Sequence, residues 1–555
     1  MHPTEISAAV FVAQALLNAM FLVTQALRPR NGWIARAYPA ILTALCLVAV
    51  ATYFNFFRFH EPGRSPVHYL EFYNYYVGTK YFRELGYNGL YEATVIADIQ
   101  DDPGAYDPQL MVRLLTDYTF ERRHQTAQRA GLIEGRFTPQ RWAEFKRDIA
   151  VFRSRDLALW RSSNVQLDRG YNGPPLVTMI LGSLANRAWM PPDTFIRVAA
   201  WLDPMLIAVA ALIGAVWAGW EVGLLFVFLW AANPFTDYSY LGGAYLRFMH
   251  VVALFLGAVA LQRGRSALAG ASFAFAALAR VYPALFAAGV VSAGVLSMGR
   301  KEEPGQGGQG PRSAMLRFAG GFALTSLLLI GLSSLQPTPN GENPWKLLGR
   351  KLATHKEEAS PNSVGLRSIF AYDDASNMAE IMRSWPDGRR LNWNVEGERT
   401  FSRRQLYFYA TTILGFLTLV WLLRRGRLED GAFAGIVVTF AWLQLSHYDY
   451  AFLCIVPFLF IGRRDALVLT SALFMLVAVS QLHPKVRAVI DFKYMVASTL
   501  IAAWLVGMLG TRLMSSPRLA PVRNDGAAPG RGGLARAEGR TAGRKTRTVR
   551  GRRSP

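Results

Sequence analysis

The chain has 555 residues, of which 52% are hydrophobic and only 18% are charged, and its mean hydropathy is +0.17. A typical soluble globular protein is less apolar than this. The apolar residues are grouped in runs of about 20, the length at which a helix crosses a bilayer. The composition therefore excludes an ordinary soluble domain and predicts an all-α, polytopic membrane protein.

Part of the net charge of +22 is concentrated near the C-terminus, where residues 511–555 contain twelve Arg and Lys residues against Asp525 and Glu538. A basic segment after a membrane helix marks the cytoplasmic side and contacts anionic headgroups. We therefore expect a disordered cytoplasmic tail whose partners are membrane lipids, with no nucleic acid. The two cysteines, Cys46 and Cys454, lie in apolar runs and indicate neither a disulfide framework nor a cysteine metal site.

Two transmembrane helices are predicted in residues 1–57. The first apolar segment, 6–27, lacks a basic leader and a small-residue cleavage pattern, so it is predicted to be a membrane helix and not a cleaved signal peptide. Arg28, Arg30 and Arg36 place the following connection in the cytoplasm. The second helix, 38–57, then returns to the external side.

Residues 58–173 form a long polar segment, which we expect to be an external loop. Within it, 107–130 and 139–165 have the pattern of amphipathic helices without the apolar length of a span. The proline pair in 171–175 (YNGPP) can begin a helix but cannot continue one. The segment 174–190 that follows either spans the membrane or re-enters it, because Arg187 interrupts the apolar run.

The remaining chain divides into a transmembrane core (174–335), a second external loop (336–403) and C-terminal transmembrane helices (404–510). Basic connections alternate with acidic or neutral ones, which places both long loops on the same, external side. Some apolar segments are shorter than about 17 residues, so we expect broken or tilted helices around a cavity. The prediction is 12 to 14 spans, with segments near 195–219, 222–235, 243–262, 266–280, 282–298, 315–335, 405–423, 431–446, 450–461, 466–482 and 489–510.

Glu71 is the first candidate for chemistry. If 70–83 is helical, Glu71, Tyr75, Gly78 and Phe82 share one face, and Gly78 leaves room for a ligand or a neighbouring helix. A carboxylate on such a face, near apolar surroundings, can act as a general base. A surface glutamate at the start of a helix is the alternative, because the positive end of the helix dipole favours it.

Two arginines interrupt apolar segments. Arg280 lies in 280–283 (RVYP), within the apolar run 266–298, and Arg247 lies near the external end of another helix. A charge in such a position is costly unless it is paired or faces a polar cavity. A guanidinium group suits a phosphate, so both are candidates for binding one. The alternative is an arginine at a helix end that is paired with a carboxylate or reaches the membrane surface.

The segment 446–450 (SHYDY) groups an imidazole, a carboxylate and phenols between two apolar segments. His447 beside an acid can handle protons or contact a phosphate, although an interfacial turn with aromatic anchors has the same composition. The second loop contains the polar stretch 355–367 (HKEEASPNSVGLR), which suits sugar or phosphate contacts as well as it suits a solvated loop. Nucleotide-binding and metalloprotease motifs are absent from the sequence.

The order of these motifs resembles the GT-C superfamily of membrane glycosyltransferases, and within it glycosyltransferase family 87, which includes mycobacterial phosphatidylinositol-mannoside mannosyltransferases. That family has an acid–Phe–x–x–Tyr–Tyr pattern, although its acid is more usually Asp. The matching elements extend over about residues 40–460 and are 71–76 (EFYNYY), 89–91 (GLY), 171–175 (YNGPP), 280–283 (RVYP), 361–366 (PNSVGL) and 446–448 (SHY).

The resemblance implies transfer of a hexose, most simply mannose, from a polyprenyl-phosphate donor to a lipid or glycan acceptor, with inversion, on the periplasmic face of a bacterial inner membrane. Glu71 would be the base, with His447 as a second catalytic residue, and Arg280 and Arg247 would bind the donor phosphate. Some enzymes of the superfamily use a divalent metal, but the sequence indicates no metal site and no cofactor. Substrate contacts are expected from Tyr75, Tyr76, Lys80, Asn362, Arg367 and Tyr448.

Two other classes of protein would account for intramembrane charges or long loops. A transporter or lipid flippase for a glycolipid would also place charges in the membrane, but it predicts related halves, and the sequence shows no internal repeat. A membrane scaffold would use the loops and the basic tail as docking surfaces and would not require Glu71.

Overall fold

The computed structural model describes residues 3–60, 64–103, 107–155, 160, 164–298, 311–356, 362–374, 393–424 and 427–514. The chain divides into two units, residues 1–513 and 514–555. Of the second unit only Met514 is described, so the expected basic tail lies outside the described residues from 515 onward. All that follows concerns the first unit.

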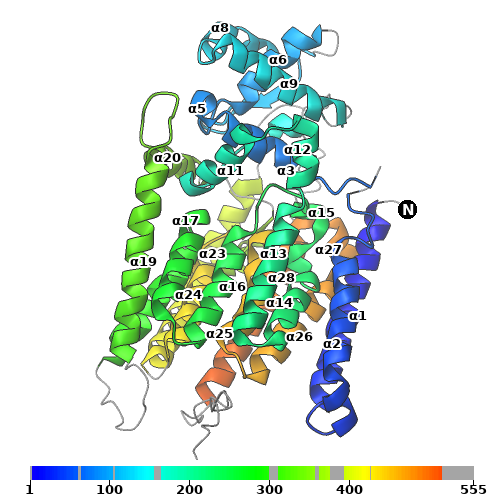
Figure 1. Ribbon diagram of the computed structural model, residues 1–555, viewed down its shortest axis with the longest axis vertical. Helices are drawn as coiled ribbons and strands as arrows, with labels where there is room; N and C mark the ends of the chain where they lie inside the picture. Colours follow the sequence, from blue (N-terminus) through cyan, green and yellow to red (C-terminus); the bar gives the residue numbers. More distant parts are fainter. Residues whose placement is uncertain are drawn as a thin grey trace, which may run out of the picture. The chain divides into compact units, whose positions relative to one another are not determined.

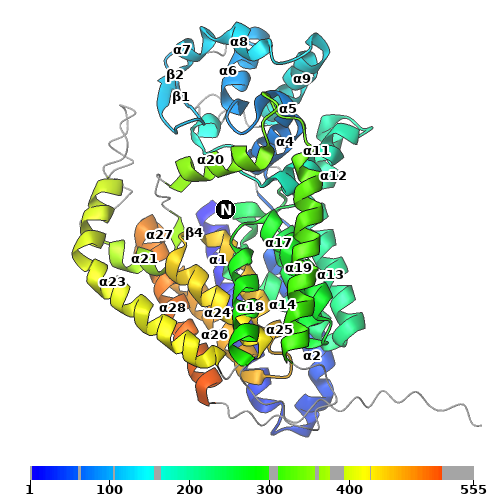
Figure 2. The same ribbon diagram turned by 90° about the vertical axis from the view of Figure 1, so that its left-hand side faces the viewer.

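The first unit is built mainly from helices, which form a bundle (Figure 1). Helices α1 and α2 lie along the opposite side of the bundle from α19 in Figure 1, and α23 lies outside α24 in Figure 2. The bundle helices are α1 (Pro3–Leu27), α2 (Gly32–Tyr53), α13 (Leu202–Ala218), α14 (Trp220–Ala231), α16 (Met249–Gln262), α17 (Ser266–Ala279), α18 (Pro283–Ser297), α19 (Pro311–Ser334), α23 (Trp393–Leu423), α24 (Leu428–Trp442), α25 (Val456–Leu459), α26 (Arg464–Ser480) and α28 (Ile490–Met514).

Short elements of the first predicted loop and the two helices that follow it gather at one end of the bundle in both views (Figure 1, Figure 2). They are α3 (Tyr69–Phe72), the π-helix η1 (Tyr73–Val77), α4 (Gly78–Lys80), α5 (Phe82–Leu85), α6 (Leu90–Asp101), β1 (Met111–Arg113), β2 (Phe120–Arg122), α7 (Arg123–Ala127), α8 (Ala130–Glu134), α9 (Pro139–Arg155), η3 (Asn164–Leu167), α11 (Pro175–Arg187) and α12 (Pro192–Ala199). Helix α11 begins at the second residue of the proline pair, as predicted.

The remaining elements are short connections. They are η4 (Pro234–Thr236), α15 (Tyr238–Leu241), α20 (Pro344–Lys356), β3 (Ser363–Val364), α21 (Leu366–Ala371), β4 (Leu445–Ser446), η5 (His447–Ile455) and α27 (Pro484–Ala488). Strands β3 and β4 pair antiparallel, with Ser363 opposite Ser446. This pairing ties the middle of the second long loop to the segment that carries His447.

Among the described residues, six helical segments are long and apolar enough to cross a membrane: Ala8–Leu27, Gly32–Tyr53, Pro192–Ala218, Arg312–Ser334, Gly397–Leu423 and Ile490–Met514. Four apolar helices are shorter, namely α14, α16, α17 and α18. An all-α membrane protein is therefore confirmed in outline, whereas the number of 12 to 14 spans, some of them broken or tilted, stays a prediction. Helix α11 has 13 residues and rises about 20 Å, less than the ~30 Å of a bilayer core, so it does not span.

The bundle helices approach one another closely at glycines. A Cβ atom on Gly289 of α18 would lie 2.0 Å from the carbonyl oxygen of Gly431 on α24, and one on Gly270 of α17 would lie 2.0 Å from that of Phe318 on α19. Small residues at helix contacts are typical of membrane proteins, in which dispersion forces between closely packed backbones drive association.

Three sequence-based predictions of secondary structure need correction. Residues 107–130 are not one amphipathic helix, because β1 and β2 form a hairpin whose turn is closed by the Asp117 side chain accepting the Thr119 N–H. The expected helix at 139–165 ends at Arg155. The first half of the expected span 450–461 belongs to the 3-10 helix η5, and the short α25 follows it.

Candidate functional site

Glu71 is held at the start of the first loop by its backbone. Its N–H donates to Nδ1 of His68, the residue that caps α3, at 3.3 Å. The chain then continues through the π-helix η1 and not through one regular helix, so the predicted single face of 70–83 is interrupted. The close approach expected at Gly78 is confirmed, since a Cβ atom there would lie 2.6 Å from Cβ of Tyr171.

The Glu71 carboxylate faces the guanidinium group of Arg247. Glu71 Oε2 lies 3.2 Å from Arg247 Nε, and the two side chains are only 16% and 5% exposed. The two atoms are not aligned for a hydrogen bond, and neither has a hydrogen-bond partner among the described residues. Glu71 Oε2 could therefore accept a hydrogen bond from a bound hydroxyl group, and Arg247 Nε could donate one to a bound hydroxyl or phosphate.

Arg247 is positioned by contacts on two sides. The carboxylate of Asp203, on α13, accepts the backbone N–H of Arg247. The guanidinium carbon lies 3.8 Å from the centre of the Tyr75 ring, a cation–π contact. The Tyr75 hydroxyl donates to Oδ1 of Asn172 at 2.9 Å, which orients the ring. Burial, the largest cause, lowers the pKa of Arg247, and the neighbouring Arg280 lowers it further, while Glu71 counteracts both.

A second charged pair lies beside the first. Arg280 follows the last residue of α17, and its Nη2 lies 3.4 Å from Oδ1 of Asp449 in η5. That oxygen is buried and has no hydrogen-bond partner among the described residues. The hydroxyl of Tyr282 donates to the backbone carbonyl of Asp449 at 3.1 Å, which fixes the acid next to the arginine.

The arginines of the two pairs both line one small cavity, which we call the Arg247 cavity. Its walls come from the ends of α11, α16 and α17 and from η1, and the residues lining it are Tyr75, Gly173, Pro174, Val177, Leu246, Arg247, Met249, His250, Ala279 and Arg280. Tyr448 is close to both pairs, since Asp449 and Glu71 add to burial in raising the pKa of its phenol, and Arg247 and Arg280 oppose that rise. The cavity thus has two guanidinium groups with carboxylates beside them.

A further carboxylate, Asp168, lies near Glu71. Its Oδ2 accepts the side-chain N–H of Asn74 at 3.0 Å. Burial raises the pKa of Asp168, and the negative charge of Glu71 raises it further. The two acids therefore differ in surroundings, with Glu71 facing a guanidinium group and Asp168 facing an amide.

Five of the predicted site residues come together at the Arg247 cavity and its two ion pairs. They are Glu71, Tyr75, Arg247, Arg280 and Tyr448. The structure also supplies partners that the sequence did not assign, namely Asp203, Asp449 and Asp168. The sequence does contain one sign of the role of Asp203. It is an acid within an apolar helix, and such a residue needs a buried partner.

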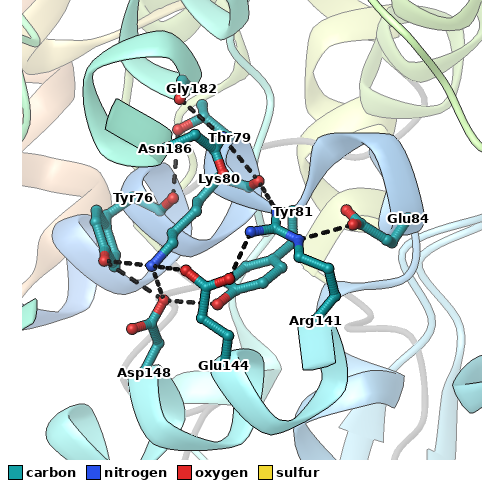
Figure 3. Close-up of polar contacts among 10 residues, drawn as sticks. All are labelled: Tyr76, Thr79, Lys80, Tyr81, Glu84, Arg141, Glu144, Asp148, Gly182 and Asn186. Atoms are coloured by element: carbon teal, nitrogen blue, oxygen red, sulfur yellow. Dashed lines mark hydrogen bonds and ion pairs between the residues drawn. The ribbon is translucent and has the colours of Figure 1, made fainter. Parts of the chain in front are cut away.

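Lys80 and Tyr76 belong to a different cluster (Figure 3). The Lys80 ammonium group lies 2.7 Å from Asp148 Oδ2, 2.8 Å from Glu144 Oε1 and 3.1 Å from the Tyr76 hydroxyl. An ammonium group has three donors, and all three are used. These contacts hold the Lys80 ammonium group within the protein, and the same cluster holds the Tyr76 hydroxyl, which donates to Asp148.

His447 is buried against aromatic rings, with the Tyr240 ring centre 4.0 Å away and the Tyr494 ring centre 5.0 Å away. Burial lowers the pKa of His447, and Lys493 lowers it further, which leaves a neutral imidazole. No hydrogen bond or ion pair between described residues links it to Glu71 or the two arginines, so the expected role in proton transfer has no geometric support.

The two residues expected to contact substrate from the second loop lie elsewhere. The carbonyl of Asn362 accepts the backbone N–H of His447 at 3.0 Å, next to the β3–β4 pair. The Arg367 guanidinium group pairs with Glu398 and stacks on Phe401, 4.4 Å from the ring centre. Much of the stretch 355–367 lies outside the described residues, or has side chains that are not described.

In the part of the chain that the structure describes, no group of three or more His, Cys, Asp or Glu side chains is arranged to hold a metal ion. No family model matches the sequence, and no curated protein or solved structure is significantly similar to it. The resemblance to family 87 therefore rests on the sequence motifs, and the arguments below rest on the geometry of the site.

Proposed function

We propose that the chain is an integral membrane glycosyltransferase that moves a hexose, with mannose as the first candidate, from a polyprenyl-phosphate donor to a hydroxyl group of a lipid or glycan acceptor. The observation that carries the proposal is that Arg247 and Arg280 line one cavity and that the Glu71 carboxylate lies 3.2 Å from Arg247. Inverting sugar transfer needs one carboxylate and a cationic surface for a leaving phosphate; the two arginines of the cavity supply the cations, and Glu71 beside Arg247 supplies the carboxylate.

In the proposed reaction the Glu71 carboxylate accepts the proton of the acceptor hydroxyl. The acceptor oxygen attacks the anomeric carbon as the bond from that carbon to the phosphate oxygen breaks. The electron pair of the broken bond leaves with the polyprenyl phosphate, and the sugar is transferred with inversion. A general base of this kind contributes roughly 10²–10⁴ in rate.

Arg247 and Arg280 stabilise the charge that develops on the departing phosphate. Preorganised cations act most strongly in a water-poor site, because they do not have to reorient as charge develops. Arg247 is fixed by Asp203 and Tyr75, and Arg280 is paired with Asp449, so both are held before the substrate arrives.

The placement of these groups favours a lipid-linked donor. Arg247 lies two residues before α16, Arg280 directly follows α17, and Tyr448 and Asp449 follow α24. The charges therefore lie at the ends of apolar helices, where a lipid chain can stay in the membrane while its phosphate enters the cavity. A transporter would require charges along a path near mid-membrane. By the pattern of basic connections, we assign this end to the periplasmic face of a bacterial inner membrane.

The test is to incubate the purified full chain with radiolabelled polyprenyl-phosphate mannose, glucose or arabinose and with lipid and glycan acceptors. We expect transfer from one of these donors, and a loss of roughly 10²–10⁴ in kcat for Glu71→Gln. A matched control is Glu342→Gln, which alters a partly exposed carboxylate paired with Arg350 outside the Arg247 cavity and is expected to keep full activity.

Two results would overturn the proposal: no transfer from any donor by folded wild-type protein, or full activity of Glu71→Gln. Asp168→Asn serves as the comparison for the second carboxylate. A larger loss for Asp168→Asn than for Glu71→Gln would move the base from Glu71 to Asp168.

A further inference from the structure

A second and larger cavity, of about 490 Å³, lies on another part of α11. It is bounded by α4, α5, α9 and α11 and by the residues that follow α19, and it shares no lining residue with the Arg247 cavity. Helix α11 contributes to both, with Val177 at the first cavity and Thr178 at the second. We call this second space the arginine cavity.

The lining of the arginine cavity is strongly basic. Five cationic side chains and one carboxylate line it: Lys80, Arg83, Arg136, Arg141, Arg187 and Glu84. Two of the five cations are neutralised by acids on the same wall (Figure 3). Lys80 pairs with Asp148 and Glu144, and Arg141 pairs with Glu84 at 3.0 Å and Glu144 at 2.8 Å.

The other three cations remain unpaired. Among the described residues, the side chains of Arg83, Arg136 and Arg187 make no hydrogen bond and no ion pair, and all three are exposed at the cavity. The paired residues hold the wall rigid: Arg141 Nη2 and Asn186 Nδ2 both donate to the carbonyl oxygen of Lys80, at 2.6 and 3.1 Å. A rigid wall with three free guanidinium groups suits a phosphate, which accepts forked hydrogen bonds from arginine.

The surroundings place this cavity at the level of the membrane surface. Gln336 and Pro337, which line it, come directly after α19, whose residues 312–334 are long and apolar enough to cross a membrane. Trp189, two residues after Arg187, is 90% exposed, and Leu335 is 80% exposed. Exposed tryptophan beside arginine is typical of the membrane interface, where the ring lies among the lipid headgroups. The phosphate that reaches the cavity from this side belongs to a lipid.

We propose that the arginine cavity binds the phosphate of an anionic phospholipid headgroup through Arg83, Arg136 and Arg187. Gly182 makes room for this wall, because a Cβ atom there would lie 2.8 Å from the carbonyl oxygen of Thr79. The lipid chains lie along α19 on the side of the exposed Leu335. This site is separate from the Arg247 cavity and does not depend on the sugar-transfer proposal.

The test measures binding of a short-chain phosphatidylglycerol to the detergent-purified full chain by native mass spectrometry and calorimetry. Phosphatidylcholine of the same chain length and inorganic phosphate are the comparison ligands. We expect a clear preference for phosphatidylglycerol, and an affinity about 100-fold lower for Arg83→Gln/Arg136→Gln/Arg187→Gln, since each cation near an anionic headgroup contributes about fivefold.

The matched control removes the same charge elsewhere. Arg30→Gln/Arg317→Gln/Arg403→Gln alters three exposed arginines away from the cavity and is expected to bind like the wild type. Ser183→Trp, which fills the cavity without changing its charge, is expected to lose binding. Size-exclusion elution and helical circular dichroism check that each variant is folded.

Three outcomes would overturn the proposal. Equal binding of phosphatidylglycerol and phosphatidylcholine would remove the requirement for an anionic headgroup. Unchanged binding by the triple cavity variant and by Ser183→Trp would place the lipid elsewhere. Binding of inorganic phosphate as tight as that of phosphatidylglycerol would make the ligand a soluble phosphate and not a lipid.

Discussion

The carboxylate of Asp203 accepts the backbone N–H of Arg247 at 2.7 Å, although the two residues are 44 positions apart in the chain. The other oxygen of the same carboxylate accepts the N–H of Phe248 at 3.1 Å. Asp203 is 2% exposed, so this contact fixes the segment before α16 from inside the bundle. The position of the guanidinium group beside Glu71 therefore depends on an acid that does not line the Arg247 cavity.

Replacing Asp203 should weaken catalysis by releasing Arg247. Asp203→Ala leaves two buried N–H groups without an acceptor, at a cost of about 1–3 kcal/mol each. We expect a lower melting temperature and a kcat lower by roughly tenfold or more, with a smaller change in KM, because Arg247 acts on the leaving phosphate. Asp203→Asn keeps one oxygen acceptor, so its melting temperature and its kcat should fall less than those of Asp203→Ala. Equal kcat values for Asp203→Ala and the wild type would contradict the positioning role.

Removing one partner of the buried Lys80–Asp148 pair should destabilise the first loop strongly. Asp148 is fully buried and Lys80 is 6% exposed, so Lys80→Met leaves an uncompensated carboxylate and should cost about 3–5 kcal/mol. Lys80→Met/Asp148→Leu removes both charges and should be more stable than Lys80→Met alone. The measurement is thermal unfolding in detergent, read as a double-mutant cycle.

An exposed pair provides the control for that cycle. Arg197 pairs with Asp193 one turn away on α12 and is 57% exposed. Arg197→Ala should change stability by at most about 1 kcal/mol, because water screens such pairs. If Lys80→Met lowers the free energy of unfolding by no more than Arg197→Ala does, the buried pair contributes little to stability.

Gly78→Ala should disturb the contact between η1, α4 and the segment before α11. The added methyl group would lie 2.6 Å from Cβ and 2.9 Å from Cγ of Tyr171, and side-chain rotation cannot move the Cβ atom away. Overpacking of this kind costs about 1–3 kcal/mol. Gly349→Ala, on α20 with no atom within 4 Å of the added methyl group, should instead stabilise by up to about 1 kcal/mol. The two melting temperatures, relative to the wild type, should shift in opposite directions.

Stability should fall as the pH drops through the range in which His68 titrates in the unfolded chain. Burial, with a smaller contribution from Arg247, lowers the pKa of folded His68 to about 4 from the ordinary value of 6.5. The unfolded state therefore binds a proton that the folded state does not, so stability present above pH 6.5 is lost progressively down to about pH 4. The loss for this one residue is up to about 3 kcal/mol.

Other groups titrate in the same range, so a variant is needed to isolate His68. Burial lowers the pKa of His60 to about 4 as well, and it raises the pKa of Asp98 to about 6, which acts in the opposite direction. His68→Asn keeps an acceptor for the Glu71 N–H and cannot be protonated. Its melting temperature should fall less than that of the wild type between pH 6.5 and pH 4. If the melting temperatures of the two proteins fall equally with pH, His68 does not cause the loss of stability.

Composition and periodicity were sufficient to predict the membrane class, the long apolar helices and the helix beginning at Pro175. They were insufficient at 107–130, which was predicted to be helical. The structure has a hairpin there, and the Asp117 side chain that closes its turn gives no signal in the hydropathy pattern. They also failed at 70–83, since a π-helix has no hydropathy signal of its own. Helices α14, α16, α17 and α18 are apolar but shorter than a full span, so an apolar segment in the sequence does not by itself predict a helix that crosses the membrane.

Within the site, single charges in apolar surroundings were informative. Arg247 and Arg280 were identified in that way, and the structure brings them to the same cavity as Tyr75. The ion pairs of Lys80 could not be predicted, because its partners lie on α9, more than 60 residues further along the chain, and no local pattern pairs them. His447 has polar neighbours in the sequence, but its ring packs among aromatic side chains in the fold.

The π-helix Tyr73–Val77 separates Glu71 from Lys80, so one short stretch of backbone supplies a residue to each of two different clusters. A π turn contains one residue more than the α turn it replaces. Deleting a single residue here would rotate everything on one side by about 100° relative to the other. Either Glu71 would lose Arg247 or Lys80 would lose Asp148. Chain length in this segment is therefore under a tighter constraint than the identity of most of its side chains, and single-residue deletions should be far more harmful here than substitutions.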